Sequence, residues 1–161
     1  MSFPLSRFAL AVSLALTLPP FALSRAQTDA QPDDGLEEPV RQFIEGFINP
    51  AQTPEQQVAY FADGVRYYRF GPTSKEEIVK DIRRTARRWP SRTYVLSRIE
   101  YIRKDPDSDD VFVSYVLDYE VANGPRSASG TASYGAIISG IHDQPKITMI
   151  MEKLGSASSG Q

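Results

Sequence analysis

Cysteine is absent from this 161-residue chain, and its absence excludes several kinds of chemistry. Without cysteine there is no disulfide bond, no thiol nucleophile, no zinc–cysteine site and no lipid-modified cysteine. Histidine occurs once, as His142, in a predicted surface turn beside Asp143. This leaves no recognisable Ser-His-Asp triad and no histidine-rich zinc site. We therefore expect no metal and no cofactor.

A basic excess is lacking as well. The chain has 18 basic and 20 acidic side chains, and its first 26 residues hold two basic and no acidic ones. The remaining 16 basic and 20 acidic residues carry a net charge of −4, which argues against a nucleic-acid partner. A hydrophobic fraction of 41% indicates a globular chain, and about 135 residues are enough for one domain.

The first 26 residues resemble an export signal. Arg7 supplies the positive charge, residues 8–18 are an almost unbroken apolar run, and small residues precede a cleavage point ahead of Gln27. The apolar run is shorter than the roughly 20 residues that cross a bilayer, and Pro19-Pro20 follows it. We predict a periplasmic protein with no transmembrane segment in the mature chain. Full secretion and an uncleaved amphipathic anchor remain as alternatives.

Three helices are predicted in the first half of the domain. Apolar residues at helical spacing begin at Leu36 and define the first helix. Thr53 with Gln56, and Ser74 with Glu77, form two capping boxes that open the second and third helices. The predicted buried faces are Leu36, Val40, Phe43, Ile44 and Phe47 in the first helix, Val58 and Phe61 in the second, and Ile78, Ile82, Thr85 and Trp89 in the third.

The second half is predicted to be β-structure. Apolar and polar residues alternate over 111–121, which is typical of a strand with one buried face. Short turns join successive strands, as in an antiparallel meander. The chain is therefore predicted to be an α+β domain: a cone-like, strongly bent antiparallel sheet packed against three N-terminal helices, with a pocket at the open end. The predicted strands are 65–70, 94–103, 111–121, 128–138 and 147–154; the domain spans 36–154, between a flexible lead-in (27–35) and a disordered tail (155–161).

Five segments have a familiar pattern, namely residues 60–68, 74–78, 87–94, 118–121 and 129–132. Together with the order of elements, they resemble the nuclear transport factor 2-like superfamily, which includes ketosteroid isomerase and the SnoaL-like polyketide cyclases. The similarity covers roughly residues 36–154, essentially the whole predicted domain, and the chain looks like an exported bacterial member. It implies a cone fold, often a dimer, whose pocket some members use for catalysis and many for binding alone.

Aromatic side chains on the predicted inner faces suggest a cavity. Such residues fill the core in many proteins, but tyrosine and tryptophan still need partners for their polar atoms. We therefore expect some of them to line a pocket for a flat, mostly apolar ligand. The candidates are Phe43, Phe47, Trp89, Tyr115, Tyr119, Tyr134 and Met149.

No carboxylate is assigned a catalytic role from the sequence. Asp118 falls on the polar face of its strand, Asp63 stands in a turn, and Glu152 reaches a pocket mouth only if its strand has the opposite phase. The sequence thus favours a non-catalytic binding domain for a small apolar ligand or a protein partner, and a homodimer. The alternative is an isomerase, dehydratase or cyclase that uses a pocket carboxylate.

The third predicted helix carries a basic outer face. It is expected to be solvated or to pair with Glu76, Glu77 and Asp81. As a second alternative function, this face would let an envelope accessory protein contact an anionic lipid or polymer. The basic-face candidates are Lys80, Arg83, Arg84, Arg87, Arg88 and Arg92.

Overall fold

A computed structural model describes residues 35–153 of the chain. The predicted signal peptide, nearly all of the lead-in and the predicted tail lie outside the described residues. Among those that are described, no helix is long and apolar enough to cross a membrane.

The helices form where the sequence predicts them. Helix α1 (Glu37–Ile48) buries the whole apolar stripe that begins at Leu36. Helices α2 (Pro54–Val58) and α3 (Lys75–Arg88) both begin with the predicted capping boxes. In each box the hydroxyl of the first residue accepts a hydrogen bond from the backbone N–H three residues later, and the Gln or Glu side-chain oxygen accepts one from the backbone N–H of the first residue.

Five strands form one sheet in the order β1-β5-β4-β3-β2. Strands β2 to β5 pair antiparallel, as predicted, whereas β1 pairs parallel with β5, so the sheet is mixed. The prediction that Phe61 belongs to the second helix is wrong, because α2 ends at Val58 and Phe61 begins β1 opposite Ile147. The strands are β1 (Phe61–Tyr67), β2 (Ser91–Lys104), β3 (Asp110–Asn123), β4 (Arg126–Ser139) and β5 (Lys146–Lys153).

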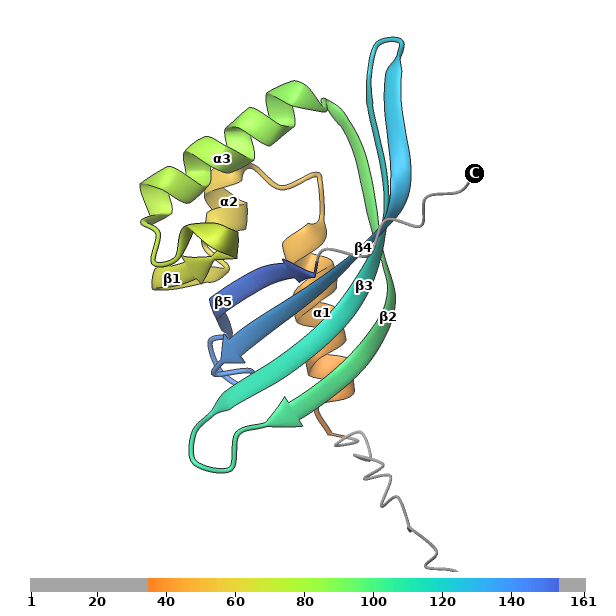
Figure 1. The fold of residues 1–161 in the computed structure, drawn as a ribbon. Helices are drawn as coiled ribbons and strands as arrows, with labels where there is room; N and C mark the ends of the chain where they lie inside the picture. The colour runs from red at the N-terminus through yellow and green to blue at the C-terminus, as the bar shows by residue number, and fades with distance from the viewer. Residues whose placement is uncertain (1–34, 154–161) are drawn as a thin grey trace, which may run out of the picture. The chain divides into compact units, whose positions relative to one another are not determined.

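The sheet is strongly curved, which confirms the predicted cone-like α+β fold (Figure 1). Register shifts in β2, between Leu96 and Arg98 and between Ile99 and Tyr101, help to bend it. Helix α1 lies in the concave side of the sheet, and α2, α3 and β1 stand beside one end of the cone. The core between α1 and the sheet contains no buried charged residue among those described.

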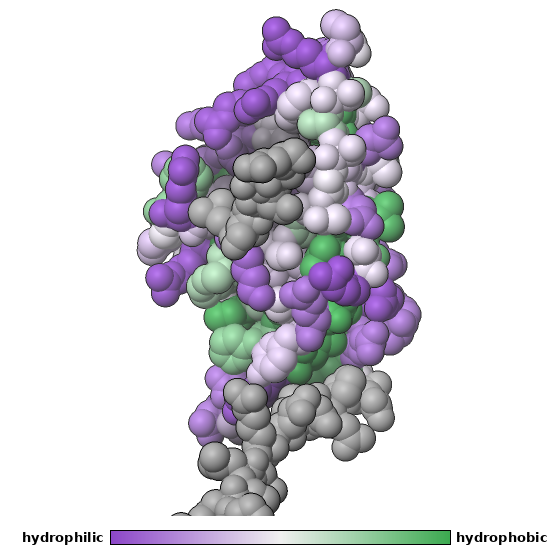
Figure 2. All heavy atoms as spheres, turned by 45° about the vertical axis from the view of Figure 1, so that its right-hand side comes forward, coloured by the Kyte–Doolittle hydropathy of each residue, from purple (hydrophilic) through white to green (hydrophobic). Residues whose placement is uncertain are grey.

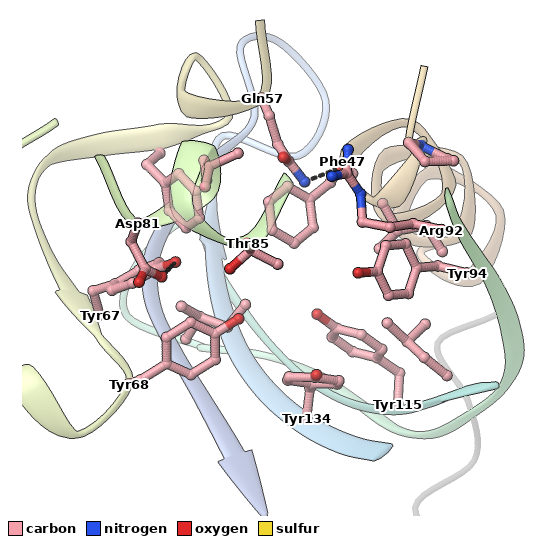
Figure 3. A pocket seen from close by; sticks show the side chains of 16 residues that line it. Phe47, Gln57, Tyr67, Tyr68, Asp81, Thr85, Arg92, Tyr94, Tyr115 and Tyr134 are labelled. Carbon is pink, nitrogen blue, oxygen red and sulfur yellow. Dashed lines mark hydrogen bonds between the residues drawn. The ribbon is translucent and has the colours of Figure 1, made fainter. Parts of the chain in front are cut away.

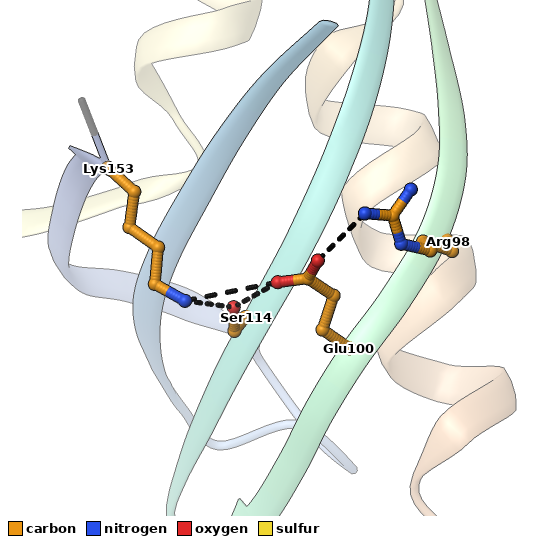
Figure 4. A network of polar contacts seen from close by, with 4 residues as sticks. All are labelled: Arg98, Glu100, Ser114 and Lys153. Atoms are coloured by element: carbon orange, nitrogen blue, oxygen red, sulfur yellow. Dashed lines mark hydrogen bonds and ion pairs between the residues drawn. The ribbon is translucent and has the colours of Figure 1, made fainter. Parts of the chain in front are cut away.

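The outer face of the sheet combines charge and exposed apolar groups. Glu100 on β2 pairs with Arg98 at 2.9 Å and accepts a hydrogen bond from Ser114 at 3.2 Å (Figure 4). Lys153 of β5 extends across β4 and contacts both Glu100 and Ser114. Hydrogen bonding to Arg98 holds the pKa of Glu100 below its usual value.

Apolar side chains lie close to this charged group. Tyr101, Phe112 and Met151 are each about 40% exposed, at 41%, 39% and 40%. Figure 2 shows apolar side chains gathered among polar ones over the lower part of the molecule. The outer face of the sheet therefore leaves part of these three side chains in contact with solvent.

Candidate functional site

A pocket of about 300 Å³ opens inside the cone. Helices α1 and α3 contribute Phe47 and Ile82, and the sheet contributes Tyr115, Leu117 and Ile150. The volume is at the lower end of the range found for small-molecule sites, roughly 300–1,000 Å³. The pocket is therefore large enough for a small ring compound.

Tyrosine hydroxyls make the apolar wall partly polar. Tyr134 stacks on Tyr115 with ring centroids 5.6 Å apart, and Figure 3 shows the hydroxyls of Tyr68, Tyr94 and Tyr115 turned towards the open space. Across residues 35–153, the hydroxyls without a hydrogen-bond partner in the protein include those of Tyr68, Tyr94, Tyr115 and Tyr134.

Burial keeps these phenols protonated. It raises the pKa of Tyr115 and of Tyr68 well above the ordinary value, and it raises that of Tyr134 to about 12. A protonated phenol is a hydrogen-bond donor as well as an acceptor. The pocket therefore presents several free donors to whatever fills it.

Asp81 is the carboxylate of the pocket wall. It comes from α3, its side chain is 27% exposed, and the hydroxyl of Tyr67 donates to its Oδ2 at 3.0 Å. Arg84, one helical turn later, forms an ion pair with its Oδ1. Burial, together with the charge of Asp81, raises the pKa of Tyr67, so this phenol remains the donor to the carboxylate.

Arg92 enters the pocket from the start of β2. One of its guanidinium nitrogens, Nη1, donates to the backbone carbonyl of Trp89 at 3.1 Å, where α3 turns into β2. Burial raises the pKa of Tyr94, and the positive charge of Arg92 partly offsets that rise. Both side chains line the same side of the pocket (Figure 3).

The backbone of Tyr68 has an unusual conformation. Its φ angle of +50° makes it the one non-glycine residue with a positive φ within the described chain. Such a conformation costs about 1–3 kcal/mol for a residue with a side chain, and strained residues of this kind cluster at functional sites. Here it delivers the Tyr68 ring into the pocket between Tyr67 and Tyr134.

Three of the seven predicted pocket residues line this pocket, namely Phe47, Tyr115 and Tyr134. Phe43 lies one helical turn before Phe47 and packs against Tyr60 outside the pocket, and Trp89 ends α3 beneath the side chain of Arg88. The remaining two do not line it either: Tyr119 covers Gly130 on the β3–β4 hairpin, and Met149 alternates with pocket-lining Ile150 and so faces the outside of the sheet.

The carboxylates considered from the sequence all lie outside this pocket. Asp63 is 93% exposed and pairs with Lys75 at 2.8 Å, and Asp118 is exposed. Glu152 is exposed as well, but it stands opposite Tyr134 on the face of β5 that carries Ile150, so the strand has the phase opposite to the predicted one. Its charge adds to burial in raising the pKa of Tyr134, so Glu152 lies near the rim of the pocket.

Sequence reasoning treated Asp81 only as a partner for basic side chains. Asp81 comes three residues after Ile78 and four before Thr85, so it lies beside the buried face of α3. This spacing is the feature of the sequence that indicates a position near the pocket.

Much of the predicted basic face is engaged within the protein. Arg83 pairs with Glu55 on α2, Arg84 with Asp81, and the Arg88 guanidinium lies 5.5 Å from the Trp89 ring centroid. Arg92 lines the pocket instead of the outer face. For Lys80 and Arg87 the described residues provide no ion pair within 4.0 Å.

His142 is exposed in the turn between β4 and β5. Between residues 35 and 153, no three His, Asp or Glu side chains gather in a way that could hold a metal ion.

Solved structures share this architecture. Aln2 from a Streptomyces species matches with a TM-score of 0.65 at 16% identity, over 76% of this chain and 92% of Aln2. A nuclear transport factor 2-like protein with a cystatin-like fold from Novosphingobium aromaticivorans matches with a TM-score of 0.60 at 11% identity, over 78% and 85%. A candidate scytalone dehydratase, also from Novosphingobium aromaticivorans, matches with a TM-score of 0.57 at 15% identity, over 74% and 81%.

No protein-family model and no curated protein matches the sequence. The structural matches nevertheless agree with one another and with the topology. The chain has the nuclear transport factor 2-like cone fold that the sequence resemblance implied.

Proposed function

We propose that this domain binds a small, mostly apolar ring compound that carries oxygen atoms, and that it does so inside the cone. One observation supports the proposal above all others: tyrosine hydroxyls that lack protein partners face a cavity of about 300 Å³ with aromatic and aliphatic walls. None of these hydroxyls is fully shut off from solvent, so in the empty pocket water is their partner. A ligand with hydroxyl or carbonyl oxygens would satisfy them while its ring fills the apolar space.

A pair of probes that differ by one hydroxyl tests this proposal. Binding of naphthalene and of 2-naphthol would be measured by fluorescence, and 2-naphthol is expected to bind about 3- to 10-fold more tightly, the equivalent of one net hydrogen bond. Tyr115→Phe and Tyr134→Phe should weaken 2-naphthol and leave naphthalene unchanged.

Tyr119→Phe is the matched control, because Tyr119 lies outside the pocket. If neither probe binds, or if Tyr119→Phe changes binding as much as Tyr115→Phe does, the pocket is not the binding site.

A second candidate function is proton transfer by Asp81. The observation that favours it is the carboxylate itself: it lines the pocket, is held in place by Tyr67 and Arg84, and is partly exposed to the cavity. A fixed carboxylate can remove a proton from a bound carbon acid, and nearby phenols can donate to the oxygen on which negative charge develops. If the domain is an isomerase, dehydratase or cyclase, Asp81 is therefore the residue that would act as the base.

The ring opening of 5-nitrobenzisoxazole tests that activity. The base removes the proton from C3, the N–O bond breaks, and its electron pair becomes the phenolate of the cyanophenol product. If Asp81 acts as a base, Asp81→Asn should lower the rate at least about 100-fold, whereas Asp118→Asn, an exposed strand carboxylate, should not. Equal rates for Asp81→Asn and the unmodified protein would leave binding as the function.

We also infer that the domain forms a homodimer through the outer face of its sheet. The exposed side chains of Tyr101, Phe112 and Met151 support this inference, since burying them would remove apolar surface from water. Phe112→Asp should convert a dimer to a monomer in light scattering after size exclusion, whereas His142→Asp, in an exposed turn, should not. A monomeric unmodified protein would contradict the inference.

Export to the periplasm is the cellular setting that we propose for this function. The sequence pattern of residues 1–26 supports it. Cell fractionation should recover the protein outside the cytoplasm, and sequencing of its N-terminus should begin at Gln27. Recovery in the cytoplasm with the first residues intact would contradict this proposal.

A further inference from the structure

Arg92 brings a positive charge into the pocket that no acid of the described chain neutralises. Its side chain is partly buried and lines the cavity. The hydrogen bond to the Trp89 carbonyl uses one nitrogen of the guanidinium, and none of the ion pairs within residues 35–153 includes Arg92. Because a guanidinium has five N–H donors, most of them remain available.

Two arginines of α3 that lie near the pocket wall differ in this respect. Arg83 has Glu55 and Arg84 has Asp81, so each carries its own counter-charge. A cation that is partly removed from water without an opposite charge is in an unfavourable position, and an anion brought by a ligand would relieve it. The planar guanidinium also matches the geometry of a carboxylate, which it can bind through two parallel hydrogen bonds.

The two charges of the pocket lie apart. Figure 3 shows Asp81, beside Tyr67, on one side of the opening and Arg92, beside Tyr94, on the other. Asp81 already has Arg84 and Tyr67 as partners, whereas Arg92 forms no ion pair with the described residues, so the acid group of a ligand would be attracted to Arg92. The ligand is therefore expected to bind in one orientation, with its acid group at Arg92 and its ring between Arg92 and Asp81.

We propose that the ligand of this pocket is a small aromatic or alicyclic carboxylate whose acid group binds Arg92. Its ring lies against Tyr115 and Tyr134, and a hydroxyl at its far end is within the polar region of Asp81 and Tyr67. This inference rests on the proposed function of ligand binding in the cone and adds the chemical class of the ligand.

The position of Arg92 also suits a purely structural role, in which it fixes the corner between α3 and β2 through the Trp89 carbonyl. A structural arginine would not distinguish an acid from its ester. The test therefore varies the ligand first and the protein second.

The experiment compares 2-naphthoate with methyl 2-naphthoate, using fluorescence titration of the full mature chain. The acid is expected to bind at least about tenfold more tightly than the ester at low ionic strength, and added salt should reduce the difference. Arg92→Gln should remove the preference for the acid and leave binding of the ester within about twofold. Arg103→Gln, an exposed position on the same strand, should keep the preference.

The outcomes separate this inference from the one on which it rests. If 2-naphthol and the ester bind but the acid has no advantage, the carboxylate class is refuted and binding in the cone stands. If no probe binds, both are refuted. If Arg92→Gln does not fold, the acid and ester titrations of the unmodified protein, with their salt dependence, decide the question.

Discussion

Replacing Tyr67 by phenylalanine removes the one hydroxyl that donates to the Asp81 carboxylate from the pocket wall. A hydrogen bond to a charged group contributes about 1.5–3 kcal/mol to stability. Asp81 keeps its ion pair with Arg84 and is 27% exposed, so water can replace part of the lost bond. We therefore expect Tyr67→Phe to lower the free energy of unfolding by about 1–2 kcal/mol.

Tyr115→Phe is the matched comparison. The Tyr115 ring is as deeply buried as that of Tyr67 or more so, but its hydroxyl has no protein partner in the described chain. Its removal should change the free energy of unfolding by less than about 0.5 kcal/mol, or raise it, because a poorly satisfied polar group is lost.

Urea unfolding of the two variants measures the difference. The midpoint should fall for Tyr67→Phe at an unchanged slope and should stay near the unmodified value for Tyr115→Phe. A double variant that combines Tyr67→Phe with Asp81→Asn should be less destabilised than the sum of its parts. If Tyr115→Phe costs as much as Tyr67→Phe, our assignment of free and engaged hydroxyls is incorrect.

Three further predictions concern the whole domain. Burial raises the pKa of Tyr115 above the value of about 10 that a phenol has in the unfolded chain. The stability that the protonated phenol contributes is therefore complete below about pH 10 and is lost as the pH rises further. In Tyr115→Phe, the free energy of unfolding should fall less steeply with pH in this alkaline range, by up to about 1.4 kcal/mol per pH unit. Ile78→Ala should lower the free energy of unfolding by about 2–5 kcal/mol in urea titrations, since this side chain is fully buried, and a loss below about 1 kcal/mol would contradict the packing of α3. Ser74→Ala should cost about 1 kcal/mol through loss of the helix cap, and an unchanged urea midpoint would argue against that cap.

Local signals in the sequence predicted most of the helices and strands. The Thr53 and Ser74 capping boxes and the stripe from Leu36 are contained within a few residues each, so periodicity and capping chemistry locate them. The parallel pairing of β1 with β5 was not predicted. No turn joins these strands, and which distant strand pairs with an edge is decided by the fold as a whole.

The sequence indicates a pocket with aromatic walls, but it identifies only some of the residues that line it. Tyr115 and Tyr134 stand on strand faces that alternation identifies, and they line the cavity as expected. Tyr68 was missed because its direction depends on a left-handed backbone that follows β1. Asp81 was missed because helical spacing places it at the margin of a buried face, and the packing of α3 determines that this margin meets the cavity.

The pairing of β1 with β5 has a consequence for how the protein is made. Phe61 and Ile147 are 86 positions apart, and a contact of this kind must close a long stretch of chain before it contributes any energy. Both strands supply walls of the cavity, through Phe61 and Tyr67 on one and Ile150 on the other. A growing chain therefore has no complete cavity until β5 has been synthesised, and capture of a ligand would report that folding has finished.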